Sequence, residues 1–204
     1  DYGIFYEFIP AEEWENENPK AVSLSGVVLG KNYAMIISTN AGLWRYNIGD
    51  TVRFTSLSPY RIKISGRTKH FINAFGEELI IENAEAAIIK ACEATGAIIE
   101  NFTAAPVYLD QGKKGSHEWI IEFKKPPADQ QLFNATLDNT LRAVNSDYDA
   151  KRAGDLALLA PRIHAAPAGT FYNWMRSRGK LGGQNKVPRL SNAREYVDEI
   201  LKSL

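Results

Sequence analysis

The chain has a single cysteine, no excess of charge of either sign and no long apolar run. Because Cys92 has no second cysteine to pair with, no disulfide forms within the chain, and a reducing compartment, the cytoplasm, is expected. Lys plus Arg number 24, as do Asp plus Glu, so no net charge directs the chain to nucleic acid. No apolar stretch is long enough to cross a bilayer, so no membrane partner is expected.

Several chemical motifs are missing as well. The three histidines, at positions 70, 117 and 164, lack the spacing of a metal site, so no metal ligands are predicted. The sequence has no P-loop, dinucleotide-binding glycine motif or nucleophile elbow. What remains is a 204-residue chain that is 45% hydrophobic, which suffices for a core in one domain or two small ones.

The first third of the chain is predicted to be β. It consists of short runs rich in β-branched and aromatic residues, separated by Asn, Gly and Pro. The expected strands are residues 4–9, 27–29, 33–38, 43–46, 52–57 and 60–64. These runs define a β subdomain at residues 1–65.

After Gly66 the pattern changes to alternating helices and strands. An apolar stripe over 81–92 predicts a helix that ends at Gly96. Further elements are expected at 103–109 and 118–123 (strands), after Asp129 (helix), at 162–165 (strand), at 170–178 (helix) and after Ser191 (helix). The fold class is therefore α+β, with a small open-faced α/β sandwich over residues 66–204.

Asp50 and Arg67 are the first candidate binding residues. Asp50 ends a Gly-Asp turn between two strands, where an exposed carboxylate can accept both hydroxyls of a ribose; Gly-Asp is also a common turn dipeptide. The Arg67 guanidinium can bind a ribose or phosphate oxygen, or form a surface salt bridge.

Two lysines are candidates for a moving part. Lys69 lies between the two predicted domains, where it is either a pivot that absorbs backbone rotation or an ordinary linker lysine. Lys186 follows a glycine-rich loop, from which it can reach a carboxylate and an α-phosphate and neutralise developing charge. The alternative for Lys186 is a solvated loop lysine.

Two further expectations concern acidic and aromatic residues. Glu77 and Glu78 are either general bases for an attacking amine or residues that favour the start of the next helix. Trp44, Trp119 and Trp174 are expected in the core rather than as stacking platforms.

The order of these segments resembles the auxin-responsive (Gretchen Hagen) family of acyl-acid amido synthetases. The resemblance rests on residues 6–10 (YEFIP), 42–50 (GLWRYNIGD), 66–67 (GR), 72–73 (IN) and 76–77 (GE). It continues at residues 147–148 (DY) with Arg152, at 169–171 (GTF) and at 184–189 (QNKVPR). It runs from residue 4 to about residue 190, nearly the whole chain.

This family belongs to the adenylate-forming superfamily, and the resemblance implies its two half-reactions. ATP, accompanied by Mg²⁺, and a carboxylic acid give an acyl-adenylate and pyrophosphate; the amine of an amino acid then forms an amide and releases AMP. The resemblance implies that Asp50 holds the ribose and Arg67 supports it. It also implies that Lys69 lies at a hinge and that Lys186 is a mobile catalytic lysine of a lid that rotates between the half-reactions.

The sequence departs from the family pattern at two places. The hinge position is often aspartate and is here Lys69, and Glu78 stands where plant relatives carry lysine; residues 75–79 look more bacterial than plant. The phosphate loop and acid pocket are expected in an N-terminal adenylating domain of the same polypeptide, so these 204 residues alone are expected to be inactive. The alternatives are a non-catalytic nucleotide-binding or regulatory module that keeps the lid fold, and an adenylate-forming enzyme that transfers the acyl group to a thiol.

Overall fold

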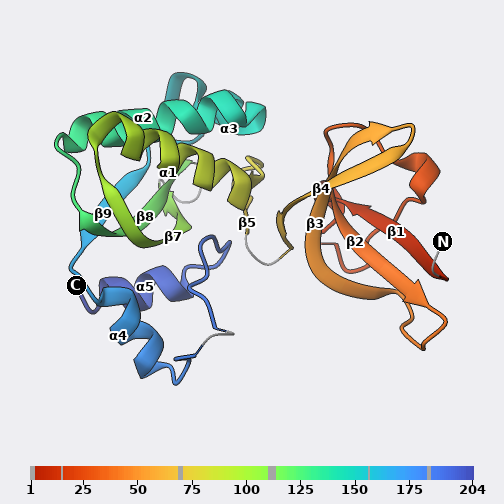
Figure 1. Ribbon diagram of the computed structural model, residues 1–204. Helices are drawn as coiled ribbons and strands as arrows, with labels where there is room; N and C mark the ends of the chain where they lie inside the picture. The colour runs from red at the N-terminus through yellow and green to blue at the C-terminus, as the bar shows by residue number, and fades with distance from the viewer. Residues whose placement is uncertain (1–2, 15, 69–70, 110–113, 156, 183–184) are drawn as a thin grey trace. The chain divides into compact units, whose positions relative to one another are not determined.

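The structure, a computed structural model, describes residues 3–14, 16–68, 71–109, 114–155, 157–182 and 185–204. The chain divides into two compact units, residues 1–69 and 70–204, which we call the β unit and the α/β unit (Figure 1). The domain boundary predicted after residue 65 stays a prediction, although the last strand of the β unit continues through Arg67.

The β unit is one antiparallel sheet with its strands in chain order. The strands are β1 (Ile4–Pro10), β2 (Asn32–Thr39), β3 (Tyr46–Leu57) and β4 (Tyr60–Arg67), with short 3₁₀ turns η1 (Ala11–Glu13) and η2 (Leu24–Gly26). Phe8, Tyr33, Val52 and Phe54 form a core on one face of this sheet. The rings of Phe8 and Phe54 meet edge to face, 5.0 Å apart, which suits their quadrupoles.

Two predicted strands of the β unit are wrong. Residues 27–29 follow η2 without joining a strand; Val27 is buried, whereas Val28 and Leu29 are exposed. Residues 43–45 are irregular because Gly42 and Arg45 have positive φ angles of 101° and 45°, which an extended strand does not allow.

The α/β unit is built on a three-stranded sheet. Its elements are β5 (Phe71–Ile72), β6 (Leu79–Ile80), α1 (Ile81–Thr95), β7 (Ile98–Leu109), β8 (Lys114–Lys125), α2 (Gln130–Val144), α3 (Ser146–Arg152), η4 (Ala153–Asp155), β9 (Arg162–Ala166), α4 (Thr170–Ser177) and α5 (Glu195–Leu201). The central strand β8 is antiparallel to β7 and parallel to β9, while β5 and β6 form a separate two-stranded ladder.

Helices pack on both faces of the sheet because successive side chains of a strand point to opposite faces and both sets are apolar here. Trp119 and Ile121 of β8 are buried against α1 and α2, whereas Ile120 points the other way, toward α4 and α5 (Figure 1). The predicted α+β class and the α/β sandwich are confirmed. No helix in the described ranges has the length and apolar composition needed to span a bilayer.

The predicted helix ends are partly confirmed. Gly96 ends α1 with a left-handed φ of 67°, and the Asp129 carboxylate accepts hydrogen bonds from two backbone N–H groups at the start of α2. The predicted cap at Ser191 is wrong, since α5 begins at Glu195 and the Ser191 hydroxyl accepts from the Ala193 N–H in the preceding turn. The sequence did not predict α3, β5 or β6.

Candidate functional site

A bulge in β3 carries the first candidate site. Ala34 and Ile36 of β2 pair with Thr51 and Asn47, so three residues of β3, 48–50, lie opposite the single residue Met35. Gly49 has a φ of 81°, which favours glycine, and its N–H donates to Asn47 Oδ1 at 2.8 Å. The bulge therefore turns Gly-Asp away from β2 and toward β4.

On the β4 side, Asp50 pairs directly with Arg67. The Arg67 Nε donates to Asp50 Oδ1 at 2.9 Å, and the two side chains are 59% and 33% exposed for Arg67 and Asp50 respectively. The backbone N–H of Thr68 donates to the Gly49 carbonyl at 3.0 Å, which closes the end of the ladder. The structure thus joins two residues that the sequence predicted to act together, with carboxylate and guanidinium both accessible to a ligand.

A buried polar group supports this bulge from inside the sheet. The Thr51 hydroxyl lies 3.1 Å from the Ser65 hydroxyl, which in turn donates to Asn32 Oδ1. Thr51, Ser65 and Asn32 are all buried. Because buried polar groups need partners, this network ties β2, β3 and β4 together beneath Asp50.

Lys186 lies in the other unit, on an irregular segment that is anchored just after it. The Pro188 carbonyl accepts from the Thr103 hydroxyl at 2.7 Å, and the Arg189 carbonyl accepts from the Ala104 N–H at 2.9 Å. The Arg189 guanidinium also pairs with Glu85. The side chain of Lys186 is exposed, so this segment presents an ammonium group next to a fixed attachment on β7.

Within the described ranges, the structure brings together two of the four predicted site residues. Asp50 and Arg67 are in direct contact, whereas Lys186 belongs to the α/β unit and Lys69 lies outside the described residues. Trp44, expected in the core, is 84% exposed, while Trp119 and Trp174 are buried as expected. The positive φ angles on either side of Trp44 hold its ring out of the sheet.

The sequence did not predict a buried pair formed by Glu77 and His117. His117 Nε2 donates to Glu77 Oε1 at 2.7 Å, and neither side chain has any exposed surface. Burial raises the pKa of Glu77, but the hydrogen bond and charge of His117 outweigh burial, so that the pKa lies below its ordinary value. Buried and already bonded, Glu77 is not available as a general base in this structure.

Beside this pair lies a second buried polar cluster. The Tyr148 hydroxyl donates to Asp138 Oδ1 at 2.7 Å, and Arg152 pairs with both oxygens of the same carboxylate, at 3.0 and 2.6 Å. The Tyr148 ring lies 5.5 Å from the His117 ring. Burial, then the Asp138 carboxylate, raise the pKa of the Tyr148 hydroxyl, which stays protonated.

The one sequence signal for these clusters was periodicity. His117 lies two residues before Trp119 on the face of β8 that the alternation buries, and Tyr148 and Arg152 lie four residues apart on α3. Their partners, Glu77 and Asp138, are remote in sequence, so no local pattern identifies the pairs.

The residues present fit a nucleotide better than a metal ion. Asp50 has one oxygen bonded to Arg67 and accessible surface left over, which suits hydroxyl groups of a ribose. Among the described residues no three His, Cys, Asp or Glu side chains gather as metal ligands. Mg²⁺ is commonly held by phosphates and water with one or two carboxylates, and we assign no residue of this chain to it.

Comparisons with known proteins show what the chain is similar to. Residues 1–67 match the GH3 family central domain, and residues 82–195 match the GH3 family C-terminal domain. The chain is 28% identical over 197 residues to indole-3-acetic acid-amido synthetase GH3.3 of Arabidopsis thaliana, covering 91% of this chain and 33% of that protein. It is 35% identical over 219 residues to indole-3-acetic acid-amido synthetase GH3.10 of the same plant, covering 95% of this chain and 36% of that protein.

The fold is also similar to a solved one. The structure of GH3.15 acyl acid amido synthetase matches with a TM-score of 0.68 and 21% identity, covering 98% of this chain and 36% of that chain. The chain therefore spans about a third of the length of the relatives it matches. The resemblance found in the sequence is confirmed: this chain belongs to the GH3 family, and it carries residues of that family's central and C-terminal domains.

Proposed function

We propose that this chain is the C-terminal part of an ATP-dependent acyl-acid amido synthetase. The observation that carries the proposal is the Asp50–Arg67 pair on the β3 bulge, within the segment that matches the GH3 central domain. The full-length protein would join a small carboxylic acid to the amine of an amino acid. The acid and the amino acid are its partners, together with an N-terminal adenylating domain of the same polypeptide.

The reaction has two steps. A carboxylate oxygen of the acid attacks the α-phosphate of ATP, which gives an acyl-adenylate and releases pyrophosphate. The amine of the amino acid then attacks the acyl carbon, loses a proton and displaces AMP. ATP would be supplied with Mg²⁺, whose charge offsets that of the phosphates.

Each site residue has a proposed role. Asp50 accepts hydrogen bonds from the ribose hydroxyls, and Arg67 orients that carboxylate through its Nε. Lys186, exposed on an anchored segment, reaches the α-phosphate and stabilises charge that develops there. Lys69, which in the sequence precedes the α/β unit, is the proposed hinge, and the α/β unit is the proposed lid. The single cysteine supports a cytoplasmic location.

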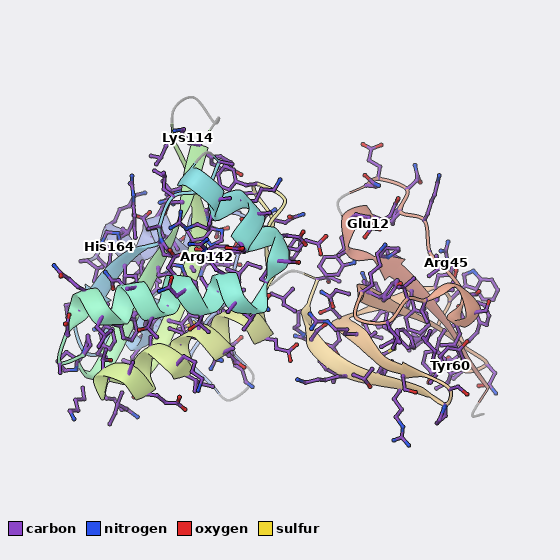
Figure 2. All side chains as sticks on the ribbon, turned by 90° about the horizontal axis from the view of Figure 1, so that it is seen from above. Glu12, Arg45, Tyr60, Lys114, Arg142 and His164 are labelled. Carbon is purple, nitrogen blue, oxygen red and sulfur yellow. The ribbon has the colours of Figure 1, made fainter. Side chains whose placement is uncertain are left out.

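ATP–pyrophosphate exchange by the full-length protein tests this proposal, with a panel of aryl and aliphatic acids. Acid-dependent exchange should fall by about a hundredfold or more in Asp50→Ala and Lys186→Ala, since both groups act on the adenylating step. Two matched controls should keep wild-type exchange. Glu12→Ala removes an exposed carboxylate of the β unit that is paired with Lys31 (Figure 2), and Lys180→Ala removes an exposed lysine shortly before Lys186.

Other outcomes would change the assignment. Exchange that survives Lys186→Ala removes this lysine from the adenylating step. No exchange with any acid, together with ATP binding that depends on Asp50, would favour the non-catalytic nucleotide-binding or regulatory module. Exchange followed by transfer to a thiol and not to an amine would identify the thiol-acylating alternative.

A further inference from the structure

The turn between β5 and β6, residues 73–78, is fixed by several side-chain hydrogen bonds to its backbone. Asn192 Oδ1 accepts from the Asn73 N–H at 2.9 Å, and Asn73 Oδ1 accepts from the Glu78 N–H at 3.1 Å. The Asn145 side-chain amide donates to the Glu77 carbonyl at 2.8 Å. Two distant parts of the α/β unit, at Asn145 and Asn192, therefore converge on one six-residue turn.

The same turn contains an unfavourable backbone conformation. Glu78 has a φ of 41°, in the left-handed region that side chains other than Gly, Asn and Asp rarely adopt. Such strain persists only where the surroundings hold it, and it is common at functional sites. The bonds to Asn73 and Asn145 are the surroundings that hold Glu78 here.

Glu77 connects the turn to the central strand of the sheet. Its Oε2 accepts from the Phe75 N–H at 2.7 Å inside the turn, and its Oε1 accepts from His117 on β8. A buried carboxylate without a partner is costly, so removing His117 would drive Glu77 toward water and distort the turn. The other ring nitrogen of His117 has no partner among the described residues, which leaves Glu77 as the polar group that fixes this ring.

The exposed apex of the turn has a cationic neighbour. A β-carbon placed at Gly76 would lie 3.4 Å from Lys151 Nζ, so the ammonium group sits against the backbone of the turn. A lysine ammonium group at an exposed apex suits an anionic reactant, such as a phosphate or a carboxylate.

We propose that Glu77 and His117 are a positioning pair that holds turn 73–78 in shape as part of the reacting surface of the ligase. The inference rests on the proposed function, because the reactants that the turn would meet are the nucleotide and the amino acid. Neither Glu77 nor His117 touches a reactant, since both are fully buried; they act through the residues of the turn.

Two variants of the full-length protein test the pair. His117→Phe removes the N–H that Glu77 accepts, whereas His117→Gln keeps an N–H donor. In His117→Phe, amide hydrogen exchange over residues 73–78 should become faster and kcat for amide formation should fall at least about tenfold. Both values should return toward wild type in His117→Gln, while thermal unfolding stays cooperative in all variants.

A matched control comes from the opposite face of β8. His164 (labelled in Figure 2) donates from Nε2 to Glu118 Oε1 at 2.8 Å, and the other hydrogen-bond partner described for this carboxylate is Arg194, not a residue of turn 73–78. His164→Phe should change neither the exchange of residues 73–78 nor kcat. If His117→Phe does not fold, Glu77→Gln provides a milder test. It keeps an acceptor for the Phe75 N–H and replaces the charged partner of His117 by a neutral amide, so both effects should have the same sign and be smaller.

The inference is overturned if hydrogen exchange of the turn is equal in wild type and His117→Phe. It is also overturned if the turn loosens without a change in kcat, or if His164→Phe lowers kcat by the same factor. If the wild-type protein makes no amide with any acid, the proposed function fails, and hydrogen exchange still decides whether the pair holds the turn.

Discussion

Asp138 is a buried carboxylate with three hydrogen bonds, one from Tyr148 and two from Arg152. Asp138→Ala should lower the free energy of unfolding by about 3–5 kcal/mol, because it removes the buried carboxylate that balances the Arg152 charge and accepts from Tyr148. Arg142 and Asp149 form an exposed pair at a similar distance, 2.6 Å (Figure 2). Arg142→Ala should lower the free energy of unfolding by no more than about 1 kcal/mol. Urea unfolding of both variants checks this, and equal losses would contradict the assignment of the Asp138 cluster to the core.

Glu77 should make the free energy of unfolding depend on pH in the acidic range. Its pKa in the folded chain is below the ordinary value of 4.5, so the stabilising contribution is present above that value and is lost as pH falls through the folded pKa. The free energy of unfolding should therefore decrease more steeply in acid for the wild type than for Glu77→Gln. Unfolding measured in urea at neutral pH and at several pH values below 4.5 checks the sign. Parallel losses in the two proteins would show that Glu77 does not contribute.

At the scale of elements, the hairpin of β7 and β8 determines where the turn at 73–78 lies. Gly115 leaves room for Phe75, whose ring also lies 5.4 Å from the ring of Tyr108. A β-carbon at Gly115 would be 1.9 Å from Phe75 Cζ and 2.7 Å from the Val107 carbonyl oxygen. The close contact, not an unusual φ, is what requires glycine at this position.

Gly115→Ala should therefore expel Phe75 and destabilise the α/β unit by about 1–3 kcal/mol. Gly26→Ala is the matched control in the β unit, because its new β-carbon would lie 3.3 Å from Val22 Cβ, a contact that small shifts relieve. Thermal unfolding and Phe75 ring chemical shifts measure the two effects. Gly115→Ala with wild-type stability and an unchanged Phe75 environment would rule out this packing.

At the scale of the whole molecule, each unit has its own apolar clusters. Phe8, Tyr33 and Phe54 belong to the β unit, and the clusters around Trp119 and around Phe171 belong to the α/β unit. Residues 70–204 should therefore fold alone, since domains with their own core commonly do. The β unit should self-associate when isolated, because its edge strand β4 exposes Ile62 and Ile64.

Expression of residues 70–204 and of residues 1–69 as separate chains checks this prediction. Circular dichroism should show one cooperative transition for residues 70–204, and light scattering should show oligomers for residues 1–69. The full chain, measured in the same way, is the control for both pieces. A non-cooperative α/β unit would mean that it depends on the rest of the chain for its stability.

Local interactions explain what could be predicted from the sequence. Gly96 and Asp129 act on backbone groups within a few residues of themselves. The helix ends that they form could therefore be predicted from the sequence. The Asp50–Arg67 pair was predicted as a combination because the family pattern joins the two residues. The turn expected at Gly49-Asp50 is instead a bulge inside the continuous strand β3. After Gly66 the short β-branched and aromatic runs give way to apolar residues at helical spacing, and this change predicted the α+β class.

The remaining features depend on residues that are distant in sequence. Trp44 looked like a core residue, and only the backbone turns beside it show that its ring faces water. The predicted start of the last helix was wrong: α5 begins at Glu195, and the preceding Arg194 is hydrogen-bonded to Glu118 and the Pro106 carbonyl, which are remote in sequence.

By itself, then, the sequence determined the fold class, the helix ends with local caps and the identity of the exposed pair at Asp50 and Arg67. The tertiary structure alone decided that Glu77 is buried against His117 and that turn 73–78 is held in a strained shape. The physical reason is that burial removes a charge from water, and the partner that makes burial tolerable is chosen by packing between remote segments, not by neighbours along the chain.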